Sequence, residues 1–379
     1  MNPVYLDYNA TTPIDPAVAD AMRPFLDGGF GNPSSSHVFG RAARAAVEDA
    51  RHSVAAMLGC HPDEVVFTSG GSEANNHAIF GCVRARGGAG HVITTRIEHP
   101  AVSEVCRVLA EEGCDITWLP VDGAGRVDPD DLRRAIRADT RLVTIMHANN
   151  EVGTIQPIAE CAAIAREYDV PFHSDAAQTV GKIPVDVDTL GVDLLSVAAH
   201  KFYGPKGVGA LYVRTGTPLE RFIHGAGHEG GRRAGTENVL LIAGLGAAAE
   251  RVVRERDGDA RHMRELRDRL HDGIRGVFPE VRLNGHSEER LPNTLSLAFP
   301  GMAAPDLMAA MPDVAVSAGA ACHGDGTVTS ATLTAMDVPT DLARGTIRFS
   351  TGRLTRAAEV DAAVAALGQA LARLAAPPQ

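Results

Sequence analysis

The chain has 379 residues and a formal net charge of −11; 45% of its residues are hydrophobic, 22% are charged and six are cysteines. This length allows two or three domains with a substantial buried core. The acidic balance, without any basic block, argues against nucleic acid as a partner. Cysteines without paired or metal-ligand spacing indicate reduced thiols, and no apolar run is long enough to cross a membrane. We therefore expect a soluble cytoplasmic protein with no membrane partner.

The first two thirds of the chain follow an α/β pattern. A short strand and an Asn- and Thr-rich loop lead into a helix that Asp15 caps and Pro16 begins. The next helix has an apolar face made of Ala43, Val47, Ala50, Val54 and Met57. Strands that alternate with helices are then predicted at 65–69, 91–95, 115–121, 141–147, 170–176, 193–199 and 209–213. This alternation is typical of a mostly parallel sheet with helices on both faces.

The last third predicts a second domain. A glycine-rich stretch, 225–238, precedes an Ala- and Leu-rich helix from about Val239, and a charged helix around 261–278 leads into the new domain. Strands are expected at 290–299 and 314–319. The last helix has an apolar stripe that predicts core packing, formed by Val360, Val364, Leu367, Leu371 and Leu374. Residues 376–379 are expected to fray.

Lys201 is the first candidate site residue. It follows the apolar residues 194–198 and precedes the turn 204–207, so it lies just past a strand end, where open α/β sheets bind their ligands. Burial between apolar segments lowers the pKa of a lysine because it disfavours the charged form. A low pKa is what a Schiff-base lysine needs. A surface lysine on a hairpin is the alternative, and the rest of the site decides between them.

Two further candidates lie at the start of predicted helices. Gly71 and Ser72 follow the strand 65–69, and backbone N–H groups at such a helix start can bind a phosphate. His99 follows the strand 91–95, and its flat imidazole can stack on an aromatic ring and exchange protons near neutral pH. A simple turn and a structural histidine are the ordinary interpretations of these two stretches.

Polar residues also follow two of the central strands. Asn150 comes after the strand 141–147 and could be an ordinary loop residue, since asparagine is common in loops. Asp175 lies near the end of 170–176, and a carboxylate there suits the pyridinium nitrogen of pyridoxal 5'-phosphate (PLP), which needs an anion to act as an electron sink. Gln178, three residues later, could donate to the phenolate oxygen of the same ring.

Taken together, these stretches resemble the cysteine desulfurases, PLP enzymes of the class V aminotransferase-like group. The resemblance runs from LDYNATTP (6–13) through HKFYGPKG (200–207) to IRFSTGR (347–353). It implies the α/β fold of PLP-dependent transferases of fold type I, with a mostly parallel seven-stranded sheet in a large domain, 16–255. Residues 1–15 and 256–379 would form a small α+β domain carrying the catalytic cysteine loop. A homodimer with active sites at the subunit interface is also implied.

The resemblance assigns a role to each matching residue. Lys201 would bind PLP covalently, His99 would stack on the ring and assist proton transfer, and Asp175 would pair with the ring nitrogen. Further cofactor contacts would come from Gly71, Ser72, Asn150, Gln178, His200 and, across the subunit interface, Thr236. Asn150 and Arg348 would bind the substrate carboxylate, for which a bidentate guanidinium is well suited. One position departs from the family: Ala198 stands where a phosphate-binding Ser is usual, so one hydroxyl contact is missing.

Cys322 is the expected nucleophile. It follows the strand 314–319 and opens a stretch of glycines and small polar residues that predicts a mobile loop. Mobility would let the thiolate reach the substrate sulfur and then carry a persulfide to an acceptor. His323, as imidazolium, could lower the pKa of the thiol. The other five cysteines are expected to be core thiols.

These residues predict a cysteine desulfurase that converts L-cysteine to L-alanine and keeps a persulfide on Cys322. The sulfur acceptor stays open: an iron–sulfur cluster assembly scaffold, a tRNA-thiolation carrier or a biosynthetic enzyme. Cys-His followed closely by Asp also resembles the selenocysteine lyases, which act on L-selenocysteine. A class V aminotransferase, which needs no thiol, and a binding scaffold without cofactor are the remaining alternatives, and no metal is expected.

Overall fold

A seven-stranded sheet lies at the centre of the computed structural model, which describes residues 3–323 and 326–375 but not the side chains of 320–323, 326–329 and 375. In the order β2-β8-β7-β6-β5-β3-β4, its strands are β2 (Val65–Thr68), β8 (Gly209–Val213), β7 (Leu194–Ala198), β6 (Phe172–Asp175), β5 (Thr140–Thr144), β3 (His91–Thr95) and β4 (Asp115–Leu119). Strand β8 is antiparallel to β2 and β7, and the other pairs are parallel. The predicted mostly parallel sheet is therefore confirmed.

Helices cover both faces of this sheet because successive strand residues point to opposite sides. Leu194 belongs to a core shared with α3 (Gly71–Ala85) and α4 (Pro100–Glu111). Its neighbour Leu195 belongs to the core on the other face. The helices of that second face are α1 (Pro16–Asp27), α2 (Val38–Leu58), α5 (Pro129–Ala135), α6 (Ile158–Glu167), α7 (Val187–Leu190) and α8 (Val239–Val277).

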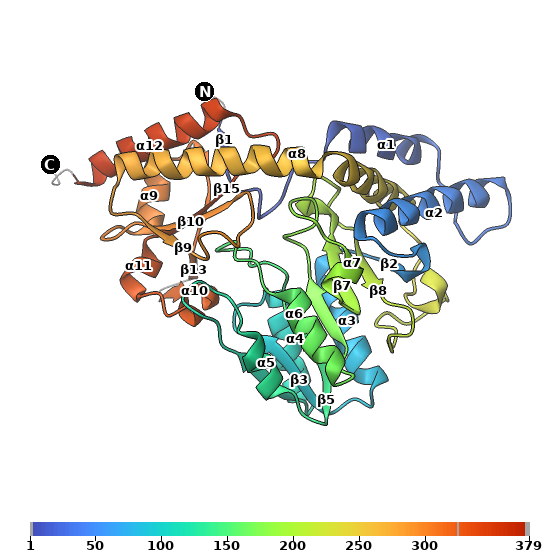
Figure 1. Ribbon diagram of the computed structural model, residues 1–379. Helices are drawn as coiled ribbons and strands as arrows, with labels where there is room; N and C mark the ends of the chain where they lie inside the picture. Colours follow the sequence, from blue (N-terminus) through green and yellow to red (C-terminus); the bar gives the residue numbers. More distant parts are fainter. Residues whose placement is uncertain (1–2, 324–325, 376–379) are drawn as a thin grey trace.

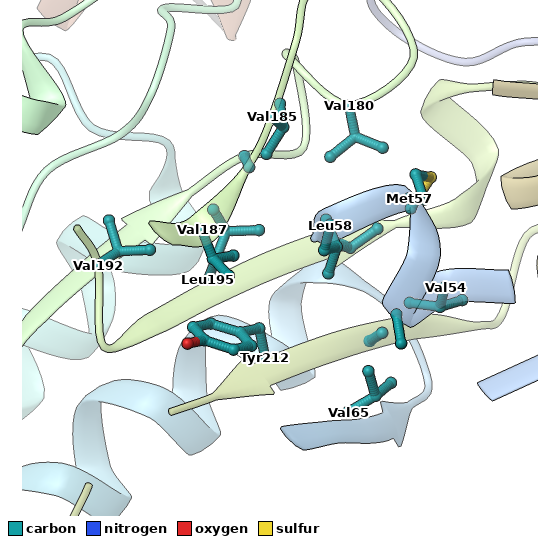
Figure 2. Close-up of a cluster of buried hydrophobic side chains, with 14 of the residues drawn as sticks. Val54, Met57, Leu58, Val65, Val180, Val185, Val187, Val192, Leu195 and Tyr212 are labelled. Carbon is teal, nitrogen blue, oxygen red and sulfur yellow. The ribbon is translucent and has the colours of Figure 1, made fainter. Parts of the chain in front are cut away.

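Figure 2 shows where the end of α2 packs on this second face. Leu58 and Tyr212 are fully buried there, beside Leu195. The helix ends at Gly59, whose φ of 71° lies in the left-handed region. A Cβ at this position would lie 2.2 Å from Asp186 Oδ2, so glycine is required both by conformation and by space.

Helix α8 is one continuous helix of 39 residues, which corrects the expectation of separate helices from Val239 and around 261–278. Figure 1 shows it running from α1 and α2 at one end to α12 (Ala357–Ala375) at the other. No proline interrupts it, and pairs such as Arg251 with Glu255 support its charged middle. The expected domain boundary between residues 255 and 256 falls within this helix.

A second, smaller core lies beside the C-terminal half of α8. Its four-stranded sheet has the order β12-β15-β10-β9, with β12 (Ser317–Ala318), β15 (Thr346–Ser350), β10 (Thr294–Ala298) and β9 (Arg282–Asn284). The helices α9 (Ala304–Ala310), α10 (Ala331–Ala335), α11 (Thr340–Arg344) and α12 complete this part of the chain. The chain start joins it: β1 (Val4–Tyr5) pairs with β11 (Val314–Ala315), and Leu6 is buried beside Phe349 in this core.

The structure corrects three details of the C-terminal prediction. The strand expected at 314–319 is divided at Val316 into β11 and β12, which join different sheets. The backbone around Cys322 forms a hairpin, β13 (Ala320–His323) with β14 (Gly326–Thr329), where a loop was expected. Leu374 is 42% exposed, so the last position of the apolar stripe is not core. Residues 376–379 lie outside the described residues, within which no helix is long and apolar enough to span a membrane.

A buried ion pair holds the glycine-rich stretch 225–238 against the sheet. Glu229, in the single turn η3 (Glu229–Gly231), accepts from Arg51 at 2.8 and 3.0 Å and from the backbone N–H of Phe67 at 2.9 Å. Both charged side chains are almost completely buried. Without Glu229, the buried guanidinium would keep only the half-exposed Glu48, at 3.3 Å, as a counter-charge.

We predict that Glu229→Gln lowers the free energy of unfolding by about 3–5 kcal/mol, because Arg51 then loses its buried counter-charge. Chemical denaturation measures this change. The matched control is Asp20→Asn, which breaks an exposed pair with Arg23 and should change stability by less than about 0.5 kcal/mol. Equal, small effects of both substitutions would contradict the prediction.

Candidate active site

The predicted site residues meet in a cavity of about 180 Å³ at the carboxyl ends of the central strands. Eight of them line it: Gly71, Ser72, His99, Asn150, Asp175, Gln178, His200 and Lys201. The other lining residues are Asn75, Ala101, Met146, Ala148, Ala177 and Ala198. The lining thus combines polar and charged side chains with small apolar ones, as in pockets that bind small molecules.

Lys201 lies in the single turn η2 (Ala199–Lys201) directly after β7, as the sequence predicts. Its Nζ donates to the backbone oxygens of Asn9 at 2.7 Å and Ala10 at 2.9 Å. Burial lowers the pKa of Lys201 to about 8, with the Arg348 cation acting in the same direction and Asp175 opposing it. A neutral amine is therefore accessible near neutral pH, which nucleophilic or basic chemistry requires.

Asp175 ends β6 and is held on both oxygens. Its Oδ1 accepts from the backbone N–H of Ala177 at 2.9 Å, and its Oδ2 accepts from Asn75 Nδ2 at 2.7 Å. Sequence reasoning missed Asn75, although its place four residues after Gly71 puts it on the same face of α3. Asn75 Oδ1 is buried without a hydrogen-bond partner among the described residues, so this oxygen is free to accept a hydrogen bond from a ligand.

His99 caps helix α4, and its Nδ1 accepts from the backbone N–H of Ala101 at 3.1 Å. This contact leaves Nε2 as the protonated nitrogen of a neutral ring. Packing of the ring against the protein lowers the pKa of His99; Asp175 opposes the shift, and the nearby Lys201 adds to it. His99 therefore faces the cavity as a neutral imidazole with a proton at Nε2.

The cavity has an anion-binding end at the start of α3. The helix begins at Gly71, and no side chain caps its first turn. A Cβ on Gly71 would lie 3.2 Å from the Cβ of Ala198, so glycine keeps this end of the cavity open. Burial, followed by the lysine charges at 201, 206 and 182, lowers the pKa of His200 to about 4. An anion would relieve this excess of positive charge.

Arg348 lies behind Asn150 and does not line the cavity. It donates to Asp7 Oδ1 at 2.7 Å, to Ser317 Oγ at 2.9 Å and to the backbone oxygen of Asn150 at 3.0 Å. A carboxylate of the chain itself is thus already paired with this guanidinium. Its expected contact with a substrate carboxylate stays a prediction.

Thr236, like Arg348, does not line the cavity, and the position of the Cys322 side chain is not described. Thr236 is exposed and lines a separate hollow with Thr68 and Ser69. Its expected contact is with another subunit, and a single chain does not test it. The side chain of Cys322 lies outside the described residues; its backbone faces Thr327 in the β13–β14 hairpin.

Sequence reasoning also missed Asn9 and Lys182. Asn9 is 1% exposed and Lys182 is 4% exposed, and both lie directly behind the cavity. Lys182 Nζ donates to Gln178 Oε1 at 2.7 Å, and Gln178 Nε2 donates to the backbone oxygen of Asn9 at 3.0 Å. The Asn- and Thr-rich loop that follows the first strand was the available signal for Asn9.

We predict that the Lys201 amine, in protein freed of bound aldehydes with hydroxylamine, titrates with a midpoint near pH 8. Trace acylation over roughly pH 6 to 11, followed by mass spectrometry of the Lys201 peptide, measures it. Arg348→Met should raise the midpoint, because a cation that disfavours the ammonium form is removed. Arg356→Met, which removes an exposed and distant cation, should not. A wild-type midpoint near that of free lysine would contradict the burial described above.

Comparison with known proteins identifies the family. The chain matches the family model for Aminotransferase class-V over residues 4–363. It is 51% identical to the cysteine desulfurase IscS of Dictyoglomus turgidum over 355 residues, 93% of this chain and 90% of that protein. The solved structure of a NifS-like protein matches with a TM-score of 0.92 at 38% sequence identity, and the match covers 98% of this chain and 100% of that one. The structure of SspA in complex with cysteine matches with a TM-score of 0.83 at 36% sequence identity, and this match covers 93% of this chain and 99% of that one. The chain therefore belongs to the cysteine desulfurases of the class-V aminotransferase family.

Proposed function

We propose that this protein is a PLP-dependent cysteine desulfurase that converts L-cysteine to L-alanine and retains the sulfur as a persulfide on Cys322. The observation that carries the proposal is the placement of the Lys201 amine and the Asp175 carboxylate in one cavity, with an uncapped helix start beside them. The identity to cysteine desulfurases over nearly the whole chain gives the substrate. The related protein SspA has been captured with cysteine bound.

The residues present fit PLP. The backbone N–H groups at Gly71 and Ser72, together with His200, would hold the phosphate, and Asp175 would face the ring nitrogen. Gln178 would direct an N–H toward the phenolate oxygen, because its other amide atom accepts from Lys182. Bound there, PLP supplies an electron sink for the electrons of the substrate Cα–H bond.

The chain's own residues move protons and accept sulfur. Lys201, neutral at its lowered pKa, can take the Cα proton of L-cysteine onto Nζ. The Cys322 thiolate attacks the substrate sulfur, so an S–S bond forms as the substrate C–S bond breaks, and the electron pair of that bond returns to carbon. Alanine needs two protons at carbon: the proton that the substrate thiol gives up, and the Cα proton that Lys201 Nζ returns. His99, with its N–H at Nε2 facing the cavity, assists this transfer. Cys322 is left as a persulfide that a sulfur-acceptor protein removes.

The assembly proposed with this function is a cytoplasmic homodimer. The exposed Thr236 lies on a stretch that the Arg51–Glu229 pair fixes to the sheet, so its hydroxyl is held outward for a second subunit. We also propose the division into a large domain, 16–255, and a small one from 1–15 and 256–379. Two separate hydrophobic cores support this division, one packed on the N-terminal half of α8 and the other on its C-terminal half.

The decisive experiment concerns Cys322. We predict that Cys322→Ala loses alanine production from L-cysteine, and that wild-type protein treated with L-cysteine carries a cyanide-labile persulfide on Cys322. The reason is that a C–S bond needs a thiolate acceptor, whereas the weaker C–Se bond of L-selenocysteine breaks with less help. Alanine assays on both substrates and mass spectrometry measure the result, with Cys60→Ala as the control.

The same assays decide between the alternatives. A wild type that turns over L-selenocysteine but ignores L-cysteine would overturn the desulfurase and establish a selenocysteine lyase, which the Cys-His sequence at 322–323 favours. Full cysteine activity without Cys322 would overturn the mechanism and would suit an aminotransferase-like reaction. Protein without any visible absorption band would point to a cofactor-free scaffold.

A substitution at Ala198 independently tests whether the phosphate of PLP binds beside Gly71. We predict that Ala198→Ser tightens PLP binding by about 1–3 kcal/mol, because it adds a hydroxyl donor to a charged group beside Gly71. Fluorescence titration of the apoprotein measures the affinity. Ala101→Ser, which adds a hydroxyl to another wall of the cavity, is the matched control. Unchanged or weaker binding of the Ala198 variant would place the phosphate elsewhere.

A further inference from the structure

Lysine is rare in this chain. Among its 36 lysine and arginine residues only three are lysines, at positions 182, 201 and 206. Lys201 is the proposed cofactor lysine, and Lys206 is exposed in the turn that follows it. Lys182 is 4% exposed and lies directly behind the cavity. A chain that otherwise uses arginine for its cations thus keeps a second buried lysine beside its site.

The contacts of Lys182 are specific. Its Nζ donates to Gln178 Oε1 at 2.7 Å and to Asn9 Oδ1 at 3.3 Å. The local backbone sets this reach: the chain turns at Gly181, where φ is 79° and a Cβ would lie 2.7 Å from Phe202. Because of this turn, the side chain of Lys182 lies on the same side of the chain as that of Gln178, which comes four residues earlier.

These contacts determine which end of the Gln178 amide faces which neighbour. The backbone oxygen of Asn9 can only accept, so the amide nitrogen must lie on its side, at 3.0 Å. Lys182 is a donor, so the amide oxygen must lie toward it. With the oxygen occupied and one N–H used on Asn9, the second N–H of Gln178 remains for the cavity that it lines. Without Lys182, only the contact with the Asn9 carbonyl would orient the amide, and the amide oxygen would lose the donor that holds it away from the ligand.

Lys182 acts as a donor rather than as a counter-ion. Within the described residues no carboxylate lies within ion-pair distance of its Nζ. Complete burial lowers the pKa of Lys182 well below the ordinary value, and the charges of Lys201 and Arg348 lower it further. An arginine could not serve here, because its guanidinium stays charged and is larger and planar.

We propose that Lys182 is a positioning residue that fixes the Gln178 amide with its N–H toward the phenolate oxygen of the cofactor. This inference rests on the proposed function, because it needs PLP in the cavity. Lys182 itself touches neither the cofactor nor the substrate. Its effect is transmitted through one hydrogen bond to Gln178 and is supported by a second one to the Asn9 side chain.

The test uses Lys182→Met, which keeps the length of the side chain but removes the donor. We expect the apoprotein to bind PLP about fivefold to tenfold more weakly, the effect of one lost hydrogen bond. We also expect the absorption maximum of the loaded protein to shift, because the phenolate oxygen loses its oriented donor. Arg356→Met, which removes an exposed cation outside the site, should alter neither quantity.

A double-mutant cycle separates positioning from a general structural effect. Lys182→Met should have almost no additional effect on PLP affinity or on the absorption maximum when Gln178→Leu is already present. An equal effect of Lys182→Met in both backgrounds would overturn the proposal, since Lys182 would then act by another route. Thermal unfolding confirms that each variant is folded; if Lys182→Met is not, Lys182→Leu, which also lacks the donor, enters the same cycle.

The readouts also separate this inference from the proposed function. Wild-type apoprotein that binds PLP while Lys182→Met binds it with unchanged affinity and an unchanged spectrum would overturn only the role of Lys182. Wild-type apoprotein that does not bind PLP would overturn the proposed function, and the positioning role with it.

Discussion

The burial of one amine organises this structure. Lys201 has to be near the carboxyl end of β7 and shielded from water, since only then does its pKa fall to about 8. The start of the chain also reaches this amine: the carbonyls of Asn9 and Ala10 accept from Nζ. The parallel sheet supplies the position, and the first ten residues supply the acceptors that orient Nζ. Two segments far apart in the sequence thus place the amine together.

Asn9 connects the surroundings of Lys201 to the smaller core. Its side chain donates to Thr294 Oγ1 at 2.8 Å and to the backbone oxygen of Asn150 at 3.1 Å, while its Oδ1 accepts from Asn293. Its backbone N–H donates to Ser350 Oγ. One fully buried amide thus joins strands β10 and β15 to the loop that carries Asn150. The pairing of β1 with β11 and the placement of Leu6 in the smaller core hold the chain start where Asn9 can do this.

The site residues that follow strands could be predicted from the sequence, whereas contacts between distant segments could not. Lys201, Asp175 and His99 each follow a clear apolar run, so periodicity alone places them at one edge of a sheet. The functions of Asn9 and Lys182 depend on partners up to 341 residues away, such as Ser350, which no local pattern reveals. Helix α8 was divided in the prediction because its charged middle breaks the apolar period; the structure keeps it helical as a bridge between two cores.

The electrostatics of the site follow from the same arrangement. The protein is acidic overall, yet Asp175 is the only carboxylate among the described residues that line the cavity, and it shares the space with Lys201 and His200. Burial lowers the pKa of both bases; the charge of Lys201 adds to the shift of His200, and the charge of Arg348 adds to the shift of Lys201. Arg348 is itself paired with Asp7. An anionic ligand at the start of α3 would add negative charge beside these cations. The lysine charges that lower the pKa of His200 would therefore also attract such a ligand to this end of the cavity.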